Sequence, residues 1–262
     1  MNDAHRRLDD LKATARPARR PATTARSGVA LRLEDVLGGF ETICRGRRCW
    51  LVETSLEALR VAHRVTPDKL AVPLHHALGA DGPAVLEPRR TLVLDIETGG
   101  FSGAPVFLIG VVPLGRRPLR VVQWLARDYP EEDGILRAFA ALAEAHDTWV
   151  TFNGKSFDEP FLHDRATVHH VPLLPPALHV DLLHAARRQW RASLPNCRLV
   201  TLEQEILGRQ RIGDVPSSDV PDLFHHFIRT GNPAPLGPVL EHNRLDLVAC
   251  TELLLRLSRR AP

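Results

Sequence analysis

The stretch Thr91-Leu92-Val93-Leu94-Asp95-Ile96-Glu97-Thr98-Gly99-Gly100 decides the fold of this chain. It has the pattern of an apolar β-strand that ends in two carboxylates. Residues two apart on a strand share a face, so Asp95 and Glu97 project together while Ile96 points into the core. The two like charges repel each other, and a hard divalent cation that prefers oxygen ligands would relieve the repulsion. A solvated strand end before a Gly-Gly turn explains the stretch equally well.

Outward from this stretch, the apolar pattern predicts an α/β fold. Short connections join the strand at 91–96 to strands at 106–112 and 119–125, which favours an antiparallel meander. Two further strands at 148–152 and 177–182 alternate with helices. We therefore expect a mixed five-stranded sheet, three antiparallel strands followed by parallel strands, with helices on both faces. The predicted helices span about 131–146, 156–169, 185–191, 201–207, 221–230 and 236–259.

The N-terminal third carries no recognisable chemistry. Residues 1–28 are rich in Arg, Ala and Pro without apolar periodicity, which predicts a basic, disordered arm. Such an arm can bind phosphates or remain a solvated tail. Residues 29–89 contain two short predicted strands, at 39–44 and 49–54, and fit a small subdomain or an N-terminal extension. The domain that carries the chemistry is expected over residues 90–260.

Composition limits the function classes. A formal net charge of +3 only mildly favours an anionic partner. The four cysteines lack the spacing of a metal site, so free thiols in a reducing cytosol are expected. We see no secretory signal and no apolar run long enough to span a bilayer, which favours a cytoplasmic protein that does not bind membranes.

Two later segments contribute further candidate site residues. Val150 to Pro160 predicts a strand, a tight turn and a helix that begins near Asp158, with Ser156 and Glu159 as a capping box. Asp158 is then either a helix cap or a second part of the site.

His242 and Asp246 are four residues apart on a predicted helix, so they share a face. This pair fits a surface imidazole–carboxylate contact, or a general base beside a metal ligand.

Together the three motifs resemble those of the DEDD superfamily of 3′-to-5′ exonucleases, which have a ribonuclease-H-like fold. The matching residues are Asp95-Ile96-Glu97, then Asn153 with Phe157-Asp158, then His242 with Asp246. The chain is also similar to the bacterial YprB-like ribonuclease-H-like domain proteins, through the stretches 152–158, 179–184, 197–203, 214–216 and 242–246. One departure concerns the last motif, because a spacing of four belongs to the superfamily branch with Tyr, whereas this chain has His242.

The resemblance implies a metal-dependent nuclease acting on DNA or RNA, with a single-stranded 3′ end as the expected partner. Asp95, Glu97, Asp158 and Asp246 would bind two Mg²⁺ or Mn²⁺ ions. His242 would act as general base, because imidazole accepts a proton near neutral pH. The candidates for nucleic-acid binding are Asn153, Lys155, Arg187, Arg188 and Arg191. Solvated positions explain Lys155 and the arginines equally well.

Two alternatives use the same residues. A non-catalytic nucleic-acid-binding module would keep the fold without turnover, but such a module has no physical need of all four carboxylates. A structure-selective endonuclease would differ from an exonuclease only in the length of its products. Asp181, which follows the fifth predicted strand, would either support the site or cap the next helix.

Overall fold

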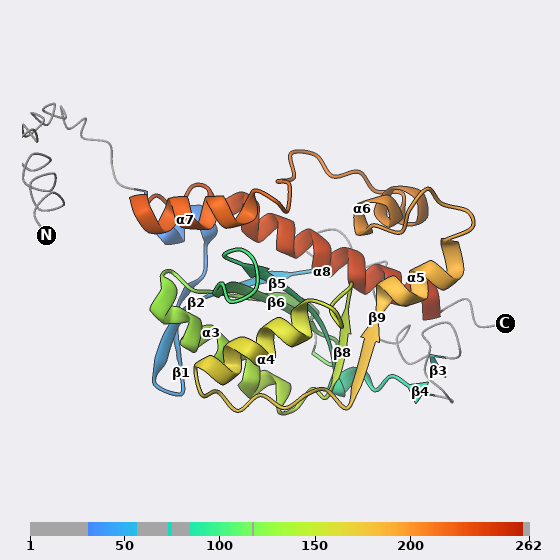
Figure 1. The fold of residues 1–262 in the computed structure, drawn as a ribbon, viewed down its shortest axis with the longest axis horizontal. Helices are drawn as coiled ribbons and strands as arrows, with labels where there is room; N and C mark the ends of the chain where they lie inside the picture. The colour runs from blue at the N-terminus through green and yellow to red at the C-terminus, as the bar shows by residue number, and fades with distance from the viewer. Residues whose placement is uncertain (1–30, 57–72, 75–83, 117, 259–262) are drawn as a thin grey trace, which may run out of the picture. The chain divides into compact units, whose positions relative to one another are not determined.

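Strand β5 (Thr91–Thr98), which carries the paired carboxylates, lies inside a mixed sheet of seven strands (Figure 1). The structure is a computed structural model, and it describes residues 31–56, 73–74, 84–116 and 118–258. In spatial order the strands are β1 (Phe40–Cys44), β2 (Arg47–Ser55), β7 (Arg120–Leu125), β6 (Val106–Pro113), β5, β8 (Thr148–Thr151) and β9 (Leu178–Asp181). Strand β5 is antiparallel to β6 and parallel to β8, as the sequence predicts.

The prediction of five strands was wrong, because the hairpin of β1 and β2 extends the same sheet. Trp50–Ser55 of β2 pairs with β7 in an antiparallel register. In a five-stranded sheet β7 would present an unpaired edge, and β2 covers that edge. The predicted arm at 1–28 lies outside the described residues. Between 56 and 90, β3 (Pro73–Leu74) and β4 (Ala84–Val85) form a separate two-stranded sheet.

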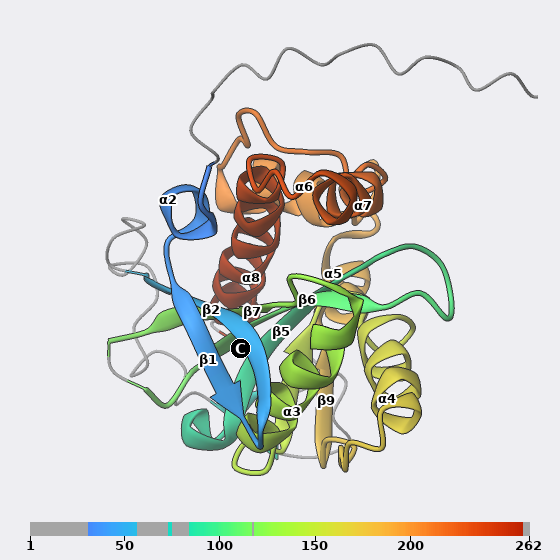
Figure 2. The same cartoon turned by 90° about the vertical axis from the view of Figure 1, so that its left-hand side faces the viewer.

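Helices cover both faces of the large sheet, as Figure 2 shows. The α-helices are α2 (Leu33–Leu37), α3 (Glu132–Ala143), α4 (Asp158–Val168), α5 (Leu182–Trp190), α6 (Leu199–Leu202), α7 (Val220–Thr230) and α8 (Leu236–Ser258). Short 3-10 helices lie at η2 (Pro88–Arg90) and η3 (Tyr129–Glu131), and α6 continues into a π-helical segment, η4 (Glu203–Leu207). Each helix predicted from residue 131 onward is present. Helices α3 and α4 lie against one face, and α8 lies against the other.

The alternation along β5 distributes its side chains between two apolar cores. Leu92 and Leu94 pack in one core with Phe139 of α3, whereas Val93 packs in a second core with Leu254 of α8. Because side chains alternate, Asp95 shares the face of Val93. The carboxylates of β5 therefore lie on the side of the sheet that α8 covers.

The cysteines form no disulfide among the described residues. Cys44, Cys49, Cys197 and Cys250 are free thiols, as their spacing predicts. Burial raises the pKa of Cys49 to about 12 and also raises that of Cys250, so both thiols are protonated near neutral pH. In the described part of the chain, no helix combines the length and apolar character needed to cross a membrane.

Candidate functional site

The carboxylates of β5 lie at the carboxyl end of the strand. Ile96 between them is 4% exposed and packs in the core, which confirms the predicted alternation. A β-bulge follows between Glu97 and Thr98. Bulges re-aim side chains and are common beside functional sites. The end of β5 thus presents Asp95 and Glu97 away from the core.

A tight turn after β8 leads to the next carboxylate. Asn153 adopts the left-handed conformation with φ of 66°, which Asn tolerates better than most residues. The next residue is Gly154, and the turn requires glycine there because a Cβ would lie 2.4 Å from the Thr151 side chain. Asp181 holds the turn by accepting hydrogen bonds from the amides of Asn153 (2.9 Å) and Lys155 (3.2 Å). Asp181 also caps α5, so it serves both of the roles expected for it.

Asp158 is the first residue of α4 and is 4% exposed. Its Oδ1 accepts a hydrogen bond from the backbone amide of Ile96 (3.2 Å), which ties this helix to the carboxylate strand. The predicted capping box was wrong, because α4 has no side-chain cap at its start. Glu159 instead bonds to Nδ1 of His179 on β9.

Helix α8 supplies an amide that the sequence analysis gave no role. Asn243 donates from Nδ2 to Asp95, at 2.7 Å to Oδ2 and 3.2 Å to the backbone oxygen. Its Oδ1 accepts a hydrogen bond from Gln123 of β7 (2.8 Å). Gly110 of β6 makes room for this contact, since a Cβ there would lie 2.1 Å from Oδ1 of Asn243. Asn243 thus fixes the Asp95 carboxylate on the sheet.

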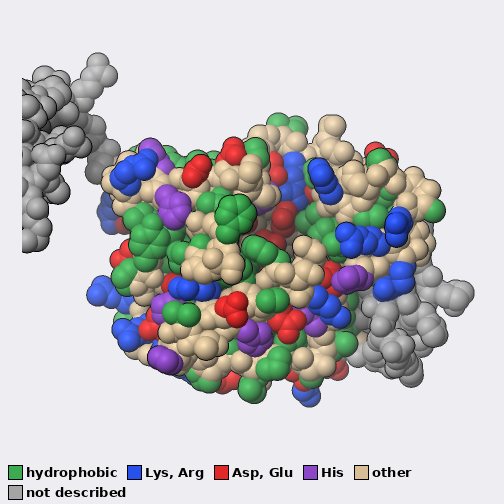
Figure 3. All heavy atoms as spheres, in the orientation of Figure 1, with side chains coloured by type: hydrophobic (Ala, Val, Ile, Leu, Met, Phe, Trp, Pro, Cys, Tyr) green, Lys and Arg blue, Asp and Glu red, His purple; other side chains and the backbone are tan. Residues whose placement is uncertain are grey.

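The candidate residues from all three motifs line one pocket of about 220 Å³. They are Asp95, Glu97, Asn153, Asp158, His242 and Asp246. Figure 3 shows acidic side chains at the bottom of a hollow near the middle of one face, with Lys and Arg side chains to its right. The predicted contacts Lys155, Arg187 and Arg188 are exposed and do not line this pocket. Arg191, just after α5, is exposed as well.

The pocket concentrates negative charge on side chains with limited access to solvent, because Asp158 is buried and Asp95, Glu97 and Asp246 are half-buried. Burial raises the pKa of Asp95 well above its usual value, and the charges of Asp246, Glu97 and Asp158 raise it further. Burial likewise raises the pKa of Glu97, with added effects from Asp246 and Asp158. Burial raises the pKa of Asp158 to about 7, although backbone hydrogen bonds oppose the shift. The ionised carboxylates therefore destabilise one another.

His242 is held by a carboxylate that the sequence analysis did not assign. Its Nδ1 lies 2.8 Å from Oδ1 of Asp214, and its Nε2 lies 3.2 Å from Oγ of Ser217. Burial would raise the pKa of Asp214, but hydrogen bonds from Arg211 and His242 outweigh it and the pKa is lowered. An ionised carboxylate only accepts hydrogen bonds, so Nδ1 carries a proton. Nε2 of neutral His242 is then the acceptor that faces the pocket.

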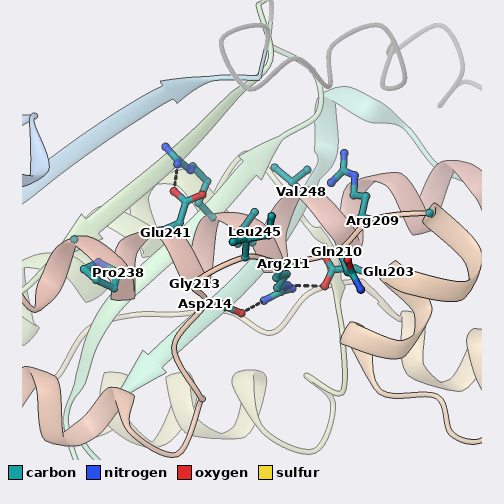
Figure 4. Close-up of a pocket in the computed structure, with 14 residues that line it drawn as sticks. Glu203, Arg209, Gln210, Arg211, Gly213, Asp214, Pro238, Glu241, Leu245 and Val248 are labelled. Carbon is teal, nitrogen blue, oxygen red and sulfur yellow. Dashed lines mark hydrogen bonds and ion pairs between the residues drawn. The ribbon is translucent and has the colours of Figure 1, made fainter.

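Arg211 connects three carboxylates at the edge of the site. It is largely buried and bonds to Glu203 (2.6 Å), Asp214 (2.9 Å) and Asp246. Figure 4 shows its guanidinium reaching Glu203 and Asp214. A larger cavity, of about 780 Å³, lies against the same segment, and none of the four candidate carboxylates lines it. The larger cavity is therefore not the one that holds the candidate carboxylates, which line the 220 Å³ pocket.

Arg211→Met is expected to lower the free energy of unfolding by about 3–5 kcal/mol, the usual result of leaving a buried charge unpaired. The reason is Glu203, whose carboxylate is 2% exposed and would lose the guanidinium. Chemical denaturation with urea measures the change.

The double variant Arg211→Met with Glu203→Leu should recover most of this stability, because no unpaired charge remains at position 203. The matched control is Arg120→Met, which breaks an exposed pair with Glu53 and should cost less than about 1 kcal/mol. Equal losses in the two single variants would contradict a buried, essential Arg211.

The donor set fits a hard divalent cation, but three of the four carboxylates are engaged with other groups. Asp95 bonds to Asn243, Asp158 to a backbone amide and Asp246 to Arg211. Within residues 31–56, 84–116 and 118–258, no three His, Cys, Asp or Glu side chains are arranged so that they could hold a metal ion. Four carboxylates in one pocket, with mutually raised pKa values, are nevertheless what such an ion would stabilise.

The mixed sheet and the acidic pocket at the end of β5 define an α/β protein with one cluster of carboxylates beside an imidazole. The chain belongs to the RNase H superfamily, whose sequence family matches residues 92–258. Nucleases of this superfamily generally use divalent metal ions.

Two known proteins are similar to this chain. "Uncharacterized protein YprB" of Bacillus subtilis (strain 168) is 35% identical over 193 residues, which are 71% of this chain and 46% of YprB. The chain thus spans about half the length of this relative. The family B DNA polymerase of Pyrobaculum calidifontis has a similar fold, with a TM-score of 0.54 and 20% identity over 67% of this chain and 25% of the polymerase. These similarities make the chain a YprB-like domain with a ribonuclease-H-like fold.

Proposed function

We propose that this chain is a metal-dependent nuclease that removes nucleotides from the 3′ end of a single strand. The observation that carries the proposal is convergence: carboxylates from β5, α4 and α8 meet an imidazole in one pocket. A protein gains no stability from like charges that are half-buried or buried together, so a ligand or a reaction is the physical reason to keep them.

In this proposal Asp95, Glu97, Asp158 and Asp246 hold two Mg²⁺ or Mn²⁺ ions. Bound there, the ions supply water of lowered pKa and neutralise charge on the phosphate. Glu97 is the carboxylate that would bind an ion with the least rearrangement, because it forms no hydrogen bond or ion pair with any described residue. Burial raises its pKa, and a bound cation would stabilise its ionised form. Asp246 would exchange its contact with Arg211 for one with an ion.

His242 accepts a proton from the attacking water at Nε2. Asp214 keeps the other ring nitrogen protonated and the ring oriented, because its carboxylate accepts from Nδ1. In the structure Nε2 lies near Oγ of Ser217, and the substrate water would take the place of that hydroxyl. In the DEDD branch with the same four-residue spacing before the last Asp, this helix position carries Tyr. Here it carries His242, so an imidazole would act as the base.

The superfamily and the fold support hydrolysis of nucleic acid, since both are of nuclease type. The proposed 3′-to-5′ direction of degradation rests on the resemblance to the DEDD exonucleases. The residues that carry this resemblance are Asp95-Ile96-Glu97, Asp158 and His242 with Asp246. The protein of similar fold is a DNA polymerase, and its likeness to this chain supports a nucleic-acid strand as the substrate only by analogy.

The test is cleavage of 5′-labelled single- and double-stranded DNA and RNA by the purified protein with Mn²⁺. We expect a ladder of products that shorten one nucleotide at a time from the 3′ end of single strands. Glu97→Gln is the matched inactive control, because it removes one charge and keeps the shape of the side chain. Internal fragments from the first time point would show an endonuclease, and binding without any cleavage would show a non-catalytic module.

A further inference from the structure

A second cleft, of about 310 Å³, reaches the candidate catalytic side chains. It shares Ser217, His242 and Asp246 with the 220 Å³ pocket and differs in all its other lining residues. The two clefts therefore meet at the general base and one carboxylate. A strand bound in the first pocket can continue into the second directly past the reacting phosphate.

Four of the ten residues that line the second cleft are apolar, and the others are polar or charged. Leu199 and Val200 lie at the start of α6, and Val215 and Pro216 lie between Asp214 and Ser217; these two pairs form the apolar walls of the cleft. Val200 is 43% exposed, so its side chain is available for contact. Apolar walls suit the face of a base and the carbon edge of a sugar, which they can contact without reading sequence.

The walls are held in fixed positions before any ligand arrives. Arg211 bonds both to Glu203, which follows α6, and to Asp214, which precedes Val215. The amide of Arg198 donates to Oδ1 of Asn196 (3.0 Å), which fixes the start of α6. A preformed cleft at the lower end of the usual range of ligand-pocket volumes fits one nucleotide.

A cation without a partner completes the cleft. Arg198 lines it, is exposed, and makes no side-chain hydrogen bond or ion pair with any described residue. Arg211, by contrast, is fully occupied with carboxylates. The guanidinium of Arg198 can therefore receive a phosphate through charge-assisted hydrogen bonds.

We propose that this second cleft is a nucleotide subsite. It takes one nucleotide of a single strand next to the scissile bond, with the base and sugar between the apolar walls and the following phosphate on Arg198. The inference rests on the proposed nuclease function and names a residue that the sequence analysis gave no role. The candidates Arg187 and Arg188 line neither cleft.

The test compares two substrates that differ in whether they reach the second cleft. Thymidine 5′-(4-nitrophenyl phosphate) has a single nucleotide, whereas a single-stranded thymidine hexanucleotide can fill both clefts. Arg198→Ala should raise KM for the hexanucleotide about tenfold, the value of one charge-assisted hydrogen bond, and leave hydrolysis of the nitrophenyl ester unchanged. Arg198→Lys should recover part of the loss. The control is Arg229→Ala on α7, whose arginine is exposed and lines neither cleft.

Binding of a labelled hexanucleotide in EDTA, followed by fluorescence anisotropy, tests the subsite without turnover. Arg198→Ala should weaken binding and flatten the slope of log affinity against log salt by about 0.7, the loss of one phosphate contact on a single strand. Val200→Glu should also weaken binding, because it places a negative charge on the apolar wall.

Two results would overturn the subsite: hexanucleotide binding by Arg198→Ala equal to that of the wild type, or equal loss of activity on both substrates. Absence of hydrolysis by the wild type would overturn the nuclease function instead, and the binding measurement would still decide the subsite.

Discussion

Asp158→Asn is expected to raise the stability of the metal-free protein at pH 8 and to abolish phosphodiester hydrolysis. Burial raises the pKa of Asp158 to about 7, whereas an aspartate in the unfolded chain has a pKa of about 3.9. Between these values the folded wild type binds a proton that the unfolded chain has lost, so its stability falls as the pH rises. Three pH units correspond to about 4 kcal/mol, which the neutral amide avoids.

The measurement is the melting temperature in EDTA from about pH 4 to pH 8. Wild type should lose stability steadily up to about pH 7, and Asp158→Asn should show a flatter profile, because only the wild type ionises at this position. Asp164→Asn is the matched control, since Asp164 lies on the same helix and is exposed. Parallel profiles for wild type and Asp158→Asn would show that the carboxylate is not under strain.

Divalent ions should act in the opposite sense. Mn²⁺ at pH 8 is expected to raise the melting temperature of the wild type by mass action on the folded state, and to raise that of Asp158→Asn much less. The cluster would then be a site where stability is given up for function, as buried active-site charges commonly are. An equal shift in the two proteins would remove Asp158 from the metal site.

The parts of the fold that were predicted correctly depend on residues close together in the sequence. The apolar pattern of 91–96 predicts β5 and the face of each side chain, and the helical periodicity of about 131–146 predicts α3. The pairing of β2 with β7 depends instead on a register between segments about 70 residues apart. No local pattern encodes that register, so the sheet has seven strands where five were predicted.

The same distinction separates the site residues that were found from those that were missed. Asp95 and Glu97, or His242 and Asp246, lie within a few residues of each other, and their spacing alone predicts a shared face. The supporting contacts join distant segments and leave no periodic signal in the sequence. Such contacts are those of Asn243 with Gln123, Asp214 with His242 and Arg211 with Glu203. The capping box predicted for Glu159 was wrong for the same reason, since the partner of Glu159 is His179, which is 20 residues away.

His242→Ala is expected to lower the rate of strand cleavage by about 10²–10⁴-fold, the usual contribution of a positioned base. Binding of the strand and of Mn²⁺ should be nearly unchanged, because His242 supplies a proton acceptor and no charge to the metal site. Single-turnover cleavage at saturating Mn²⁺, from about pH 5.5 to pH 9, measures the effect. The acidic limb of the wild-type profile should disappear in the variant, since imidazole protonation would cause that limb.

The partner of His242 makes the test specific. Asp214→Asn keeps an oxygen at this position but adds an amide that can donate to Nδ1, which would leave the proton on Nε2 and remove the acceptor. Cleavage should therefore fall in the single Asp214→Asn variant, and the double variant should be no worse than His242→Ala alone, because both changes remove one function. Asp222→Asn on α7 is the control, since that carboxylate is exposed and lines neither cleft. Additive losses would mean that Asp214 acts apart from His242, and a wild-type rate in His242→Ala would leave the imidazole no part in the reaction.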